Sequence, residues 1–420
     1  MSMVMEDGMK AKKLTLVATF AVAALALTAC QGAAASGGSG GDGAVEEIVI
    51  GALHPLSGAN AADGQQMSHA AKMAVDEINE AGGIESLNGA KLVLEAVDTK
   101  GEPETGQSEA TRLIQEGASA LVGSFQSGTS ANIAAVSERN EVPFVMDVSA
   151  LDSILEQGYT YSFRVQPSGG MMGERSAVYL KDMADEAGTE IQRIGFLYEQ
   201  GNYGASVYKA FEAKASELGM TVSTAISYDP AASDLSTQVQ QALAGGVDLL
   251  AVTGYYRDGL LISQAVNAMA PDVKAVFGVA NGGYDQTQFV VDAPNGGEGY
   301  LNANYRIDVT NDRSKAVAAA FEESFGEPMR TSAALTYDAV NVIAAALEEG
   351  GSAVPSDIRD AIAELSYEPI VVNDGPVEFD SAGQNKNATV SVLQVQGGKT
   401  LTVFPNELAE ASYVFPAPVK

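Results

Sequence analysis

The fold is decided by one stretch, Leu121-Val122-Gly123-Ser124-Phe125-Gln126-Ser127-Gly128-Thr129-Ser130, in which an apolar run ends in a polar turn containing glycine. The short branched run is typical of a strand buried on both faces of a parallel sheet. The spacing of Ile133 and Val136 after the turn predicts a helix. The stretch therefore predicts a strand that passes directly into a helix.

The turn itself suits a negatively charged group. The first N–H groups of a helix have no partner within the helix and lie at the positive end of its dipole. Together with the hydroxyls of Ser127, Thr129 and Ser130, they could hold a carboxylate. Serine and threonine also cap helices where no ligand binds, so capping alone is the alternative interpretation of this turn.

Strand-like and helix-like segments alternate along the rest of the chain, which favours parallel sheets with helices on both faces. The pattern starts at 47–52 and restarts after 163–167, and we expect the chain to cross between two α/β units there and again within 300–309. Further strands are expected at 92–97, 142–145, 193–197, 220–226, 249–252, 274–277, 378–380, 389–394 and 400–404. Helices are expected at about 63–81, 105–115, 173–186, 203–218, 236–244, 259–268, 315–325 and 331–347.

Ligands of open α/β sheets bind beyond the carboxyl ends of the strands, so the loops after the strands are the candidate walls of a site. These loops carry hydroxyl, aromatic and acidic side chains. From them we select as candidate ligand-binding residues Gln126, Ser127, Thr129, Asp147, Ser149, Ala150, Tyr203, Tyr255 and Asn281.

The first 30 residues are typical of a secretion signal. Three lysines precede an apolar run from Leu14 to Ala29 that is too short for a comfortable membrane span, and Cys30 follows. Cys30, the only cysteine of the chain, resembles the lipidated cysteine of a bacterial lipoprotein. Residues 31–45, rich in Gly, Ala and Ser, are expected to be a flexible tether. We therefore expect a body held by lipid on the outer face of the cytoplasmic membrane.

Composition narrows the class of protein. A chain of 420 residues is long enough for two domains, and 46% hydrophobic residues indicate a globular body. The formal charge of −30 argues against nucleic acid as a partner, because nucleic acid is itself negative. We find no G-x-S-x-G elbow, no histidine pair at metal spacing and no phosphate loop, so we expect no enzyme activity, metal or cofactor.

The body resembles the solute-binding proteins of branched-chain amino acid ABC importers, which have the type I periplasmic-binding fold. The resemblance runs from Ile48 to about Val403. It rests on several short motifs in order: Pro55-Leu56-Ser57-Gly58, Ala74-Val75-Asp76-Glu77-Ile78-Asn79, Val122-Gly123 before the serine turn, Phe163-Arg164, Asn202-Tyr203-Gly204, Gly254-Tyr255-Tyr256 and Thr336-Tyr337-Asp338-Ala339-Val340.

The resemblance implies two Rossmann-like lobes joined by three hinge crossings, with lobe 1 at 46–165 and 305–388 and lobe 2 at 166–304 and 389–420. It also implies a receptor that closes on a small carboxylate-bearing molecule, most simply an aliphatic amino acid, and delivers it to ABC permease subunits. An amide, a urea or a small aromatic acid is the alternative ligand, and a sensor without a transport role is the alternative function.

The same resemblance implies roles for individual residues, and this sequence differs from the family's pattern at two of these positions. It places the ligand's carboxylate at Ser127 and the backbone near Ala150, but the polar residue expected next is Leu151. The glutamate that pairs with the ligand's ammonium is expected at Ala280 and is missing. Either another loop supplies the acid, from Asp147, Glu199 or Asp258, or the ligand is not a standard α-amino acid.

Two tyrosines and two histidines have competing interpretations. At most one of the neighbours Tyr255 and Tyr256 is expected to face the site. His54 lies in a loop beside the site, where a structural role is favoured over ligand binding. His69 lies on the side of its helix opposite the apolar residues, so we expect it to be exposed to solvent.

Overall fold

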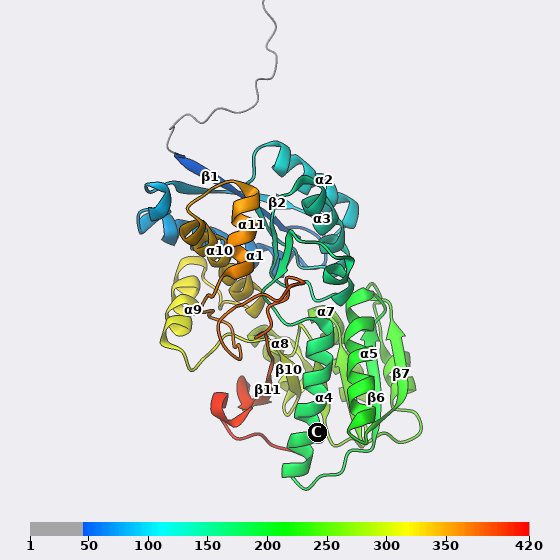
Figure 1. Ribbon diagram of the computed structural model, residues 1–420. Coiled ribbons are helices and arrows are strands. Elements are labelled where there is room, and N and C mark those ends of the chain that lie inside the picture. Colours follow the sequence, from blue (N-terminus) through cyan, green and yellow to red (C-terminus); the bar gives the residue numbers. More distant parts are fainter. Residues whose placement is uncertain (1–44, 420) are drawn as a thin grey trace, which may run out of the picture. The chain divides into compact units, whose positions relative to one another are not determined.

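The computed structural model describes residues 45–419. Two sheets form the framework of this part of the chain, and helices cover both faces of each (Figure 1). The predicted α/β class with two mostly parallel sheets is thereby confirmed. Among the described residues, no helix is long and apolar enough to cross a membrane. Residues 1–44, with the predicted signal, Cys30 and nearly all of the tether, lie outside the described part.

The first sheet has five parallel strands in the order β2-β1-β3-β4-β5. Their bounds are β1 Glu47–His54, β2 Lys91–Asp98, β3 Ala120–Gly123, β4 Phe144–Met146 and β5 Ser162–Arg164. Strand β3, the apolar run of the opening stretch, is the central strand and all four of its residues are buried. Its central position places the following turn in the middle of the carboxyl edge of this sheet.

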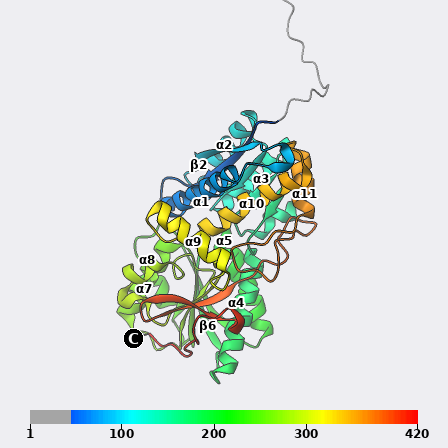
Figure 2. The same cartoon turned by 90° about the vertical axis from the view of Figure 1, so that its left-hand side faces the viewer.

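Helices pack in pairs on the first sheet. Helix α1 (Ala61–Glu80) lies against α10 (Thr331–Gly350), and α2 (Pro103–Gln115) lies against α3 (Ser127–Asn140). The two pairs lie on opposite sides of the strands (Figure 1), and α1 and α10 run side by side in Figure 2. Helix α10 follows strands β6 to β10 in the chain, so the chain returns to the first sheet before it adds β11 and β12 to the second.

The second sheet has seven strands in the order β12-β11-β10-β9-β8-β6-β7. Strands β6 to β10 pair in parallel, whereas β11 joins β10 and β12 in antiparallel fashion. The bounds are β6 Arg193–Glu199, β7 Thr221–Tyr228, β8 Leu249–Thr253, β9 Val276–Val279, β10 Leu301–Asn304, β11 Ser391–Gln396 and β12 Lys399–Phe404.

Helix α4 (Gly169–Glu186) packs against α5 (Asn202–Glu217), and α6 (Ser236–Ala242) packs against α7 (Tyr256–Met269). The remaining α-helices are α8 Thr287–Asp292, α9 Asp312–Phe325 and α11 Pro355–Glu364. Three segments pass between the two sheets: the one from β5 to α4, the one from β10 to α9, and the one that leads into β11.

The predicted elements differ from the observed ones in a few places. The segment 378–380 is not a strand, because it makes only isolated bridges, such as Phe379 to Asn385. Three short elements, β5, α8 and α11, were not predicted. Strand β5 has only three residues and α8 only six, which is too short for a periodic pattern. Residues 300–309, predicted as a crossing, contain strand β10 before the chain crosses.

Candidate functional site

A small cavity lies where the carboxyl ends of strands from both sheets face each other. The loops after β3 and β4 border it from the first sheet, and those after β6, β8 and β9 border it from the second. Helix α4 and the segment after β10 complete the wall. Its volume is about 30 Å³, far below that of an ordinary ligand pocket. The lining residues are Phe125, Ser127, Val148, Met172, Tyr203, Gly254, Tyr255, Gly282 and Tyr305.

Aromatic rings make up much of this wall. The ring of Tyr255 lies between two others, 5.9 Å from Phe125 of the first sheet's loop and 5.7 Å from Tyr203, measured between centroids. The Tyr203 hydroxyl donates a hydrogen bond to the backbone carbonyl of Ala280. Burial raises the pKa of Tyr203 and of Tyr255, so both hydroxyls remain neutral at physiological pH. The wall therefore offers apolar surface and uncharged hydroxyls.

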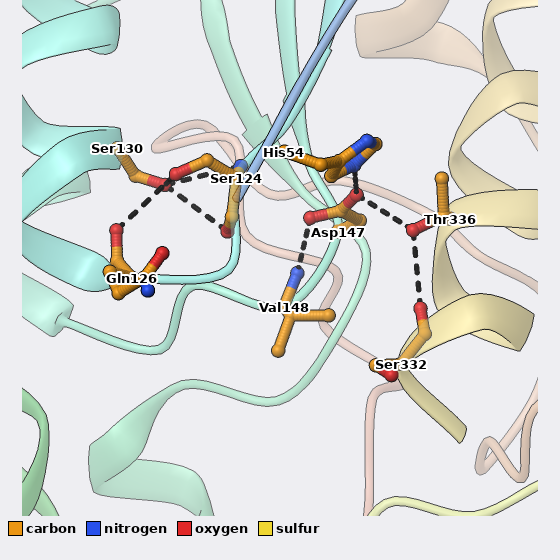
Figure 3. A network of polar contacts seen from close by, with 8 residues as sticks. All are labelled: His54, Ser124, Gln126, Ser130, Asp147, Val148, Ser332 and Thr336. Atoms are coloured by element: carbon orange, nitrogen blue, oxygen red, sulfur yellow. Dashed lines mark hydrogen bonds and ion pairs between the residues drawn. The ribbon is translucent and has the colours of Figure 1, made fainter. Parts of the chain in front are cut away.

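Ser127 is the first residue of α3 and borders the cavity. Gln126 occupies the N-cap position, but its side chain makes no capping hydrogen bond within the described residues. The turn is held instead by Ser124, whose hydroxyl lies 3.0 Å from that of Ser130 (Figure 3). Ser130 therefore points inward and braces the turn. The start of α3 keeps its free N–H groups beside the cavity, which is the arrangement that binds anions.

Two further residues of this turn do not border the cavity. The methyl group of Thr129 packs above Gly106 of α2, where a Cβ on the glycine would come within 2.4 Å of it. The Gln126 amide lies equally close to Gly101. The Thr129 side chain therefore fills the contact between α2 and α3, and the Gln126 side chain packs on the loop that precedes α2.

Asp147 is completely buried, and its carboxylate has partners on β1, on α10 and in its own loop (Figure 3). One carboxylate oxygen lies 2.8 Å from the His54 Nε2 atom and accepts the Thr336 hydroxyl, also at 2.8 Å. The other oxygen accepts the N–H of Val148. His54, which precedes the loop after β1, therefore has the structural role that the sequence favoured, and Asp147 ties the end of β1 to α10.

The two other acids proposed as replacements for the missing glutamate are also engaged within the protein. Buried Glu199 accepts the N–H groups of Gly201 and Gly204, which closes the start of α5. Asp258 accepts the N–H of Tyr255 and the hydroxyl of Tyr228 at the start of α7. Burial raises the pKa of Asp258 to about 6. Neither acid lines the cavity.

Three more candidates, Ala150, Ser149 and Asn281, do not line the cavity. The carbonyl of Ala150 accepts the N–H of Gly169, which links the loop after β4 to the start of α4. Ser149 is buried beside it. The Asn281 side chain accepts the N–H groups of Gly283 and Tyr284, so it shapes the loop after β9 without lining the cavity.

The structure thus brings together at the cavity three of the nine predicted residues, Ser127, Tyr203 and Tyr255. Four lining residues were not among the predicted ones: Phe125, Val148, Met172 and Tyr305. Phe125 and Val148 lie within loops from which other residues were selected. Both could have been identified by expecting apolar side chains to face the polar turn across the site. Tyr305 lies in the predicted crossing, and Met172 carries no signal that distinguishes it from a core residue.

Two smaller expectations have clear outcomes. Tyr255 lines the cavity, whereas Tyr256 points to α8 and donates to Asp292, so only one of the pair faces the site. The expectation that His69 is exposed to solvent was wrong, because its ring stacks on Phe325 of α9 with centroids 4.4 Å apart. The described residues contain no cluster of three His, Cys, Asp or Glu side chains that could hold a metal ion.

Comparison with known proteins gives a consistent result. The sequence profile of the periplasmic binding protein family matches residues 47–399. The chain is 30% identical over 389 residues to the Leu/Ile/Val-binding protein homolog 8 of Brucella abortus, which covers 89% of this chain and 94% of the relative.

Solved structures with the same fold include two with different bound ligands. The substrate-binding protein LivJ of Streptococcus pneumoniae, in complex with isoleucine, is 24% identical, with a TM-score of 0.74 over 88% of this chain and 99% of that one. A solute-binding protein of an ABC transporter from R. palustris, in complex with benzoate, is 18% identical, with a TM-score of 0.74 over 89% of this chain and 97% of that one. At these identities the likeness shows the fold.

Proposed function

Because this chain belongs to the periplasmic binding protein family, we propose that it binds a small carboxylate-bearing solute between its two sheets and presents it to an ABC importer. The family consists of substrate-binding receptors, so the chain is a receptor and not an enzyme. An aliphatic branched-chain amino acid is the first candidate ligand, since relatives are named for leucine, isoleucine and valine.

The observation that carries this proposal is the open start of α3 at the cavity. Ser127 borders the cavity, and no side chain of the described residues caps the helix there. The helix dipole and the free N–H groups favour a carboxylate at this point. The rings of Phe125, Tyr203 and Tyr255 then surround the apolar remainder of the ligand.

A small aromatic acid is a second candidate, and the same wall favours it. Four aromatic side chains line the cavity, and no acidic side chain does so among the described residues. An unpaired ammonium in such a place would be costly, whereas an aromatic carboxylate needs no acidic partner. The structure with bound benzoate shows that this fold can hold such a ligand.

The cavity as it stands is too small for either ligand, so binding requires that the walls separate. We infer that residues 46–165 with 305–388, and residues 166–304 with 389–420, act as two lobes that open and close about the crossing segments. A ligand that contacts both walls would favour the closed form. The family implies an extracytoplasmic location, and we further propose a lipid at Cys30 and ABC permease subunits as partners.

A thermal-unfolding screen of the body, residues 45–420, tests this function. The panel contains the branched-chain amino acids, glutamine, benzoate and 4-methylbenzoate. A ligand that binds only the folded state raises the midpoint, by mass action. We expect at least one of these carboxylates to raise it in a concentration-dependent manner. If none does, the proposed function is wrong.

A further inference from the structure

A second and larger cavity lies beside the crossing segment that follows β10. Its volume is about 460 Å³, within the range of small-molecule sites. Helices α1 and α9 and residues 327–331 border it from the side of the first sheet, and residues 285–288 and Thr400 border it from the side of the second. It is therefore formed by the same two groups of elements as the cavity at Ser127.

Two oppositely charged side chains line this cavity and keep unused hydrogen-bonding atoms. Asp285 is partly exposed as a residue, but its Oδ1 atom is shielded from water and has no hydrogen-bond partner within residues 45–419. The Nε–H group of Arg306 is likewise buried and unpaired in this part of the chain. The guanidinium reaches the Thr400 carbonyl at 3.3 Å through another nitrogen. The Oε1 atom of Gln286, which also lines the cavity, is buried and unpaired within the same residues, so two acceptors and one donor are left at the wall.

Unpaired buried groups of this kind are costly, so they point to a missing partner. Burial raises the pKa of Asp285 to about 6, while the nearby charge of Arg306 opposes that rise. Asp63 and Arg330 also act on Asp285, but they pair with each other at 3.0 Å. Arg306 also reaches Glu410, at 3.9 Å, but through another nitrogen of its guanidinium. The Asp285 Oδ1 atom and the Arg306 Nε–H group therefore remain as charged-group atoms that a ligand could pair with.

The balance of charge restricts what that ligand group can be. A cation on Asp285 would be repelled by Arg306, Arg330 and Lys315, which line the same cavity. An anion on Arg306 would be repelled by Asp285 and Glu327. A neutral group that both donates and accepts avoids both penalties, and a carboxamide or urea has an N–H donor beside a carbonyl acceptor.

The second cavity is linked to the first by two short segments. Tyr305 lines the first cavity and its neighbour Arg306 lines the second. Gly282 lines the first cavity, and Asp285 lies three residues further along the same loop. The charge of Asp285 also acts on the Tyr203 and Tyr305 hydroxyls, which raises the pKa of both tyrosines in addition to the effect of their burial. The two cavities therefore share the loop after β9 and the segment after β10 as parts of their walls.

We propose that the two cavities are parts of one ligand cleft and that the larger one is its second subsite. There Asp285 accepts a hydrogen bond from a carboxamide-like group and Arg306 donates one to it, at the end of the ligand remote from its carboxylate. This inference rests on the proposed function. It makes Asp285 and Arg306 determinants of specificity, in place of an acid near Ala280.

Matched ligand pairs test the subsite by calorimetric titration of the body. Glutamine is compared with norleucine, and 4-carbamoylbenzoate with 4-methylbenzoate. In the pair that binds, we expect the amide to bind at least about tenfold more tightly, because only the amide satisfies both wall groups. Asp285→Ala should remove this preference and leave the affinity for the apolar partner unchanged. Asp182→Ala, which removes an exposed acid of α4 that lines neither cavity, is the control and should change neither affinity.

The outcomes separate this inference from the proposed function. If the apolar partners bind but the amides have no advantage, or if Asp285→Ala leaves the preference intact, the subsite is wrong and the receptor function stands. If no carboxylate binds, both fail. The unfolding midpoint of free Asp285→Ala provides a further check. It should equal or exceed that of the wild type, because the variant removes an unpaired buried acid.

Discussion

At the scale of single residues, hydrogen-bond partners decide which polar side chains can meet a ligand. Ser127 and Asp147 follow the adjacent strands β3 and β4, and both are buried. Asp147 has three partners inside the protein, whereas the Ser127 side chain lies at the cavity without a capping role. The same position at the end of a strand therefore gives a structural brace in one case and a candidate contact in the other.

Asp147→Ala tests this division. Removing the carboxylate leaves the buried His54 Nε2 atom without its partner and Thr336 with only the Ser332 carbonyl, so the free energy of unfolding should fall by about 2–3 kcal/mol. Denaturant unfolding measures the change. Asp76→Ala, which removes an exposed pair with Lys72, should change it by less than about 1 kcal/mol. Unchanged stability together with lost ligand binding would show instead that Asp147 contacts the ligand.

At the scale of elements, the position of α3 depends on its close contact with α2. Gly106 of α2 lies beneath Thr129 without room for a side chain, because a Cβ there would approach the Thr129 methyl group to 2.4 Å. The start of α3, with Ser127, is one turn or less from this contact. Packing of α2 therefore helps to fix the N–H groups that border the cavity.

Gly106→Ala should push α3 away and lower the free energy of unfolding by about 1–3 kcal/mol, through overpacking. It should also weaken ligand binding, because Ser127 moves with the helix. Thermal unfolding and titration measure both effects. Gly128→Ala is the matched control, since its added methyl group would meet Pro103 at an ordinary 3.6 Å. Equal stability of the two variants would show that the contact is not tight.

Helix α10 carries a buried acid that makes stability depend on pH. Asp338 accepts the N–H groups of Ile370 and Val371 and the hydroxyl of Tyr367. Burial raises its pKa from 3.8 to about 7, although these bonds and the charge of Arg313 oppose the rise. Because the folded-state pKa is the higher one, the protonated acid stabilises the folded state, and this contribution is lost as pH rises through about 7.

Asp338→Asn should therefore flatten the pH dependence. From this group we expect the free energy of unfolding of the wild type to be roughly 2 kcal/mol higher at pH 5 than at pH 8. The asparagine variant should lack this difference, because its amide does not titrate. Urea unfolding at the two pH values measures it. If the variant has the same pH dependence as the wild type, groups other than Asp338 cause the difference in stability between the two pH values.

At the scale of the whole molecule, the order of elements could be predicted from the sequence. The buried apolar runs of β1, β3, β6 and β8 and the periodic helices between them carry a strong signal. The membership of α10 in the first sheet's layer could not be predicted from periodicity, because that contact joins residues far apart in the chain. Only the resemblance to a family led us to expect that the segment containing α10 belongs to lobe 1.

The site could be predicted only in part. Ser127, Tyr203 and Tyr255 were found because strand-end loops point to the carboxyl edge of a sheet. The sequence could not show that Asp147, Glu199 and Asp258 are engaged, since their partners depend on tertiary packing or on the geometry of a helix start. Asp285 and Arg306 were missed for the same reason, because their significance lies in atoms left unpaired by the fold.

The central claim is that a small carboxylate is held from both sides, by the start of α3 and by the aromatic wall of the second sheet. Calorimetric titration of the best ligand into the wild type, Ser127→Ala and Tyr255→Ala tests it most directly, with exposed Ser108→Ala as control. We expect each of the two site variants to weaken binding by roughly 1–3 kcal/mol and the control to leave it unchanged. Full affinity in either site variant would contradict a ligand held between the two sheets.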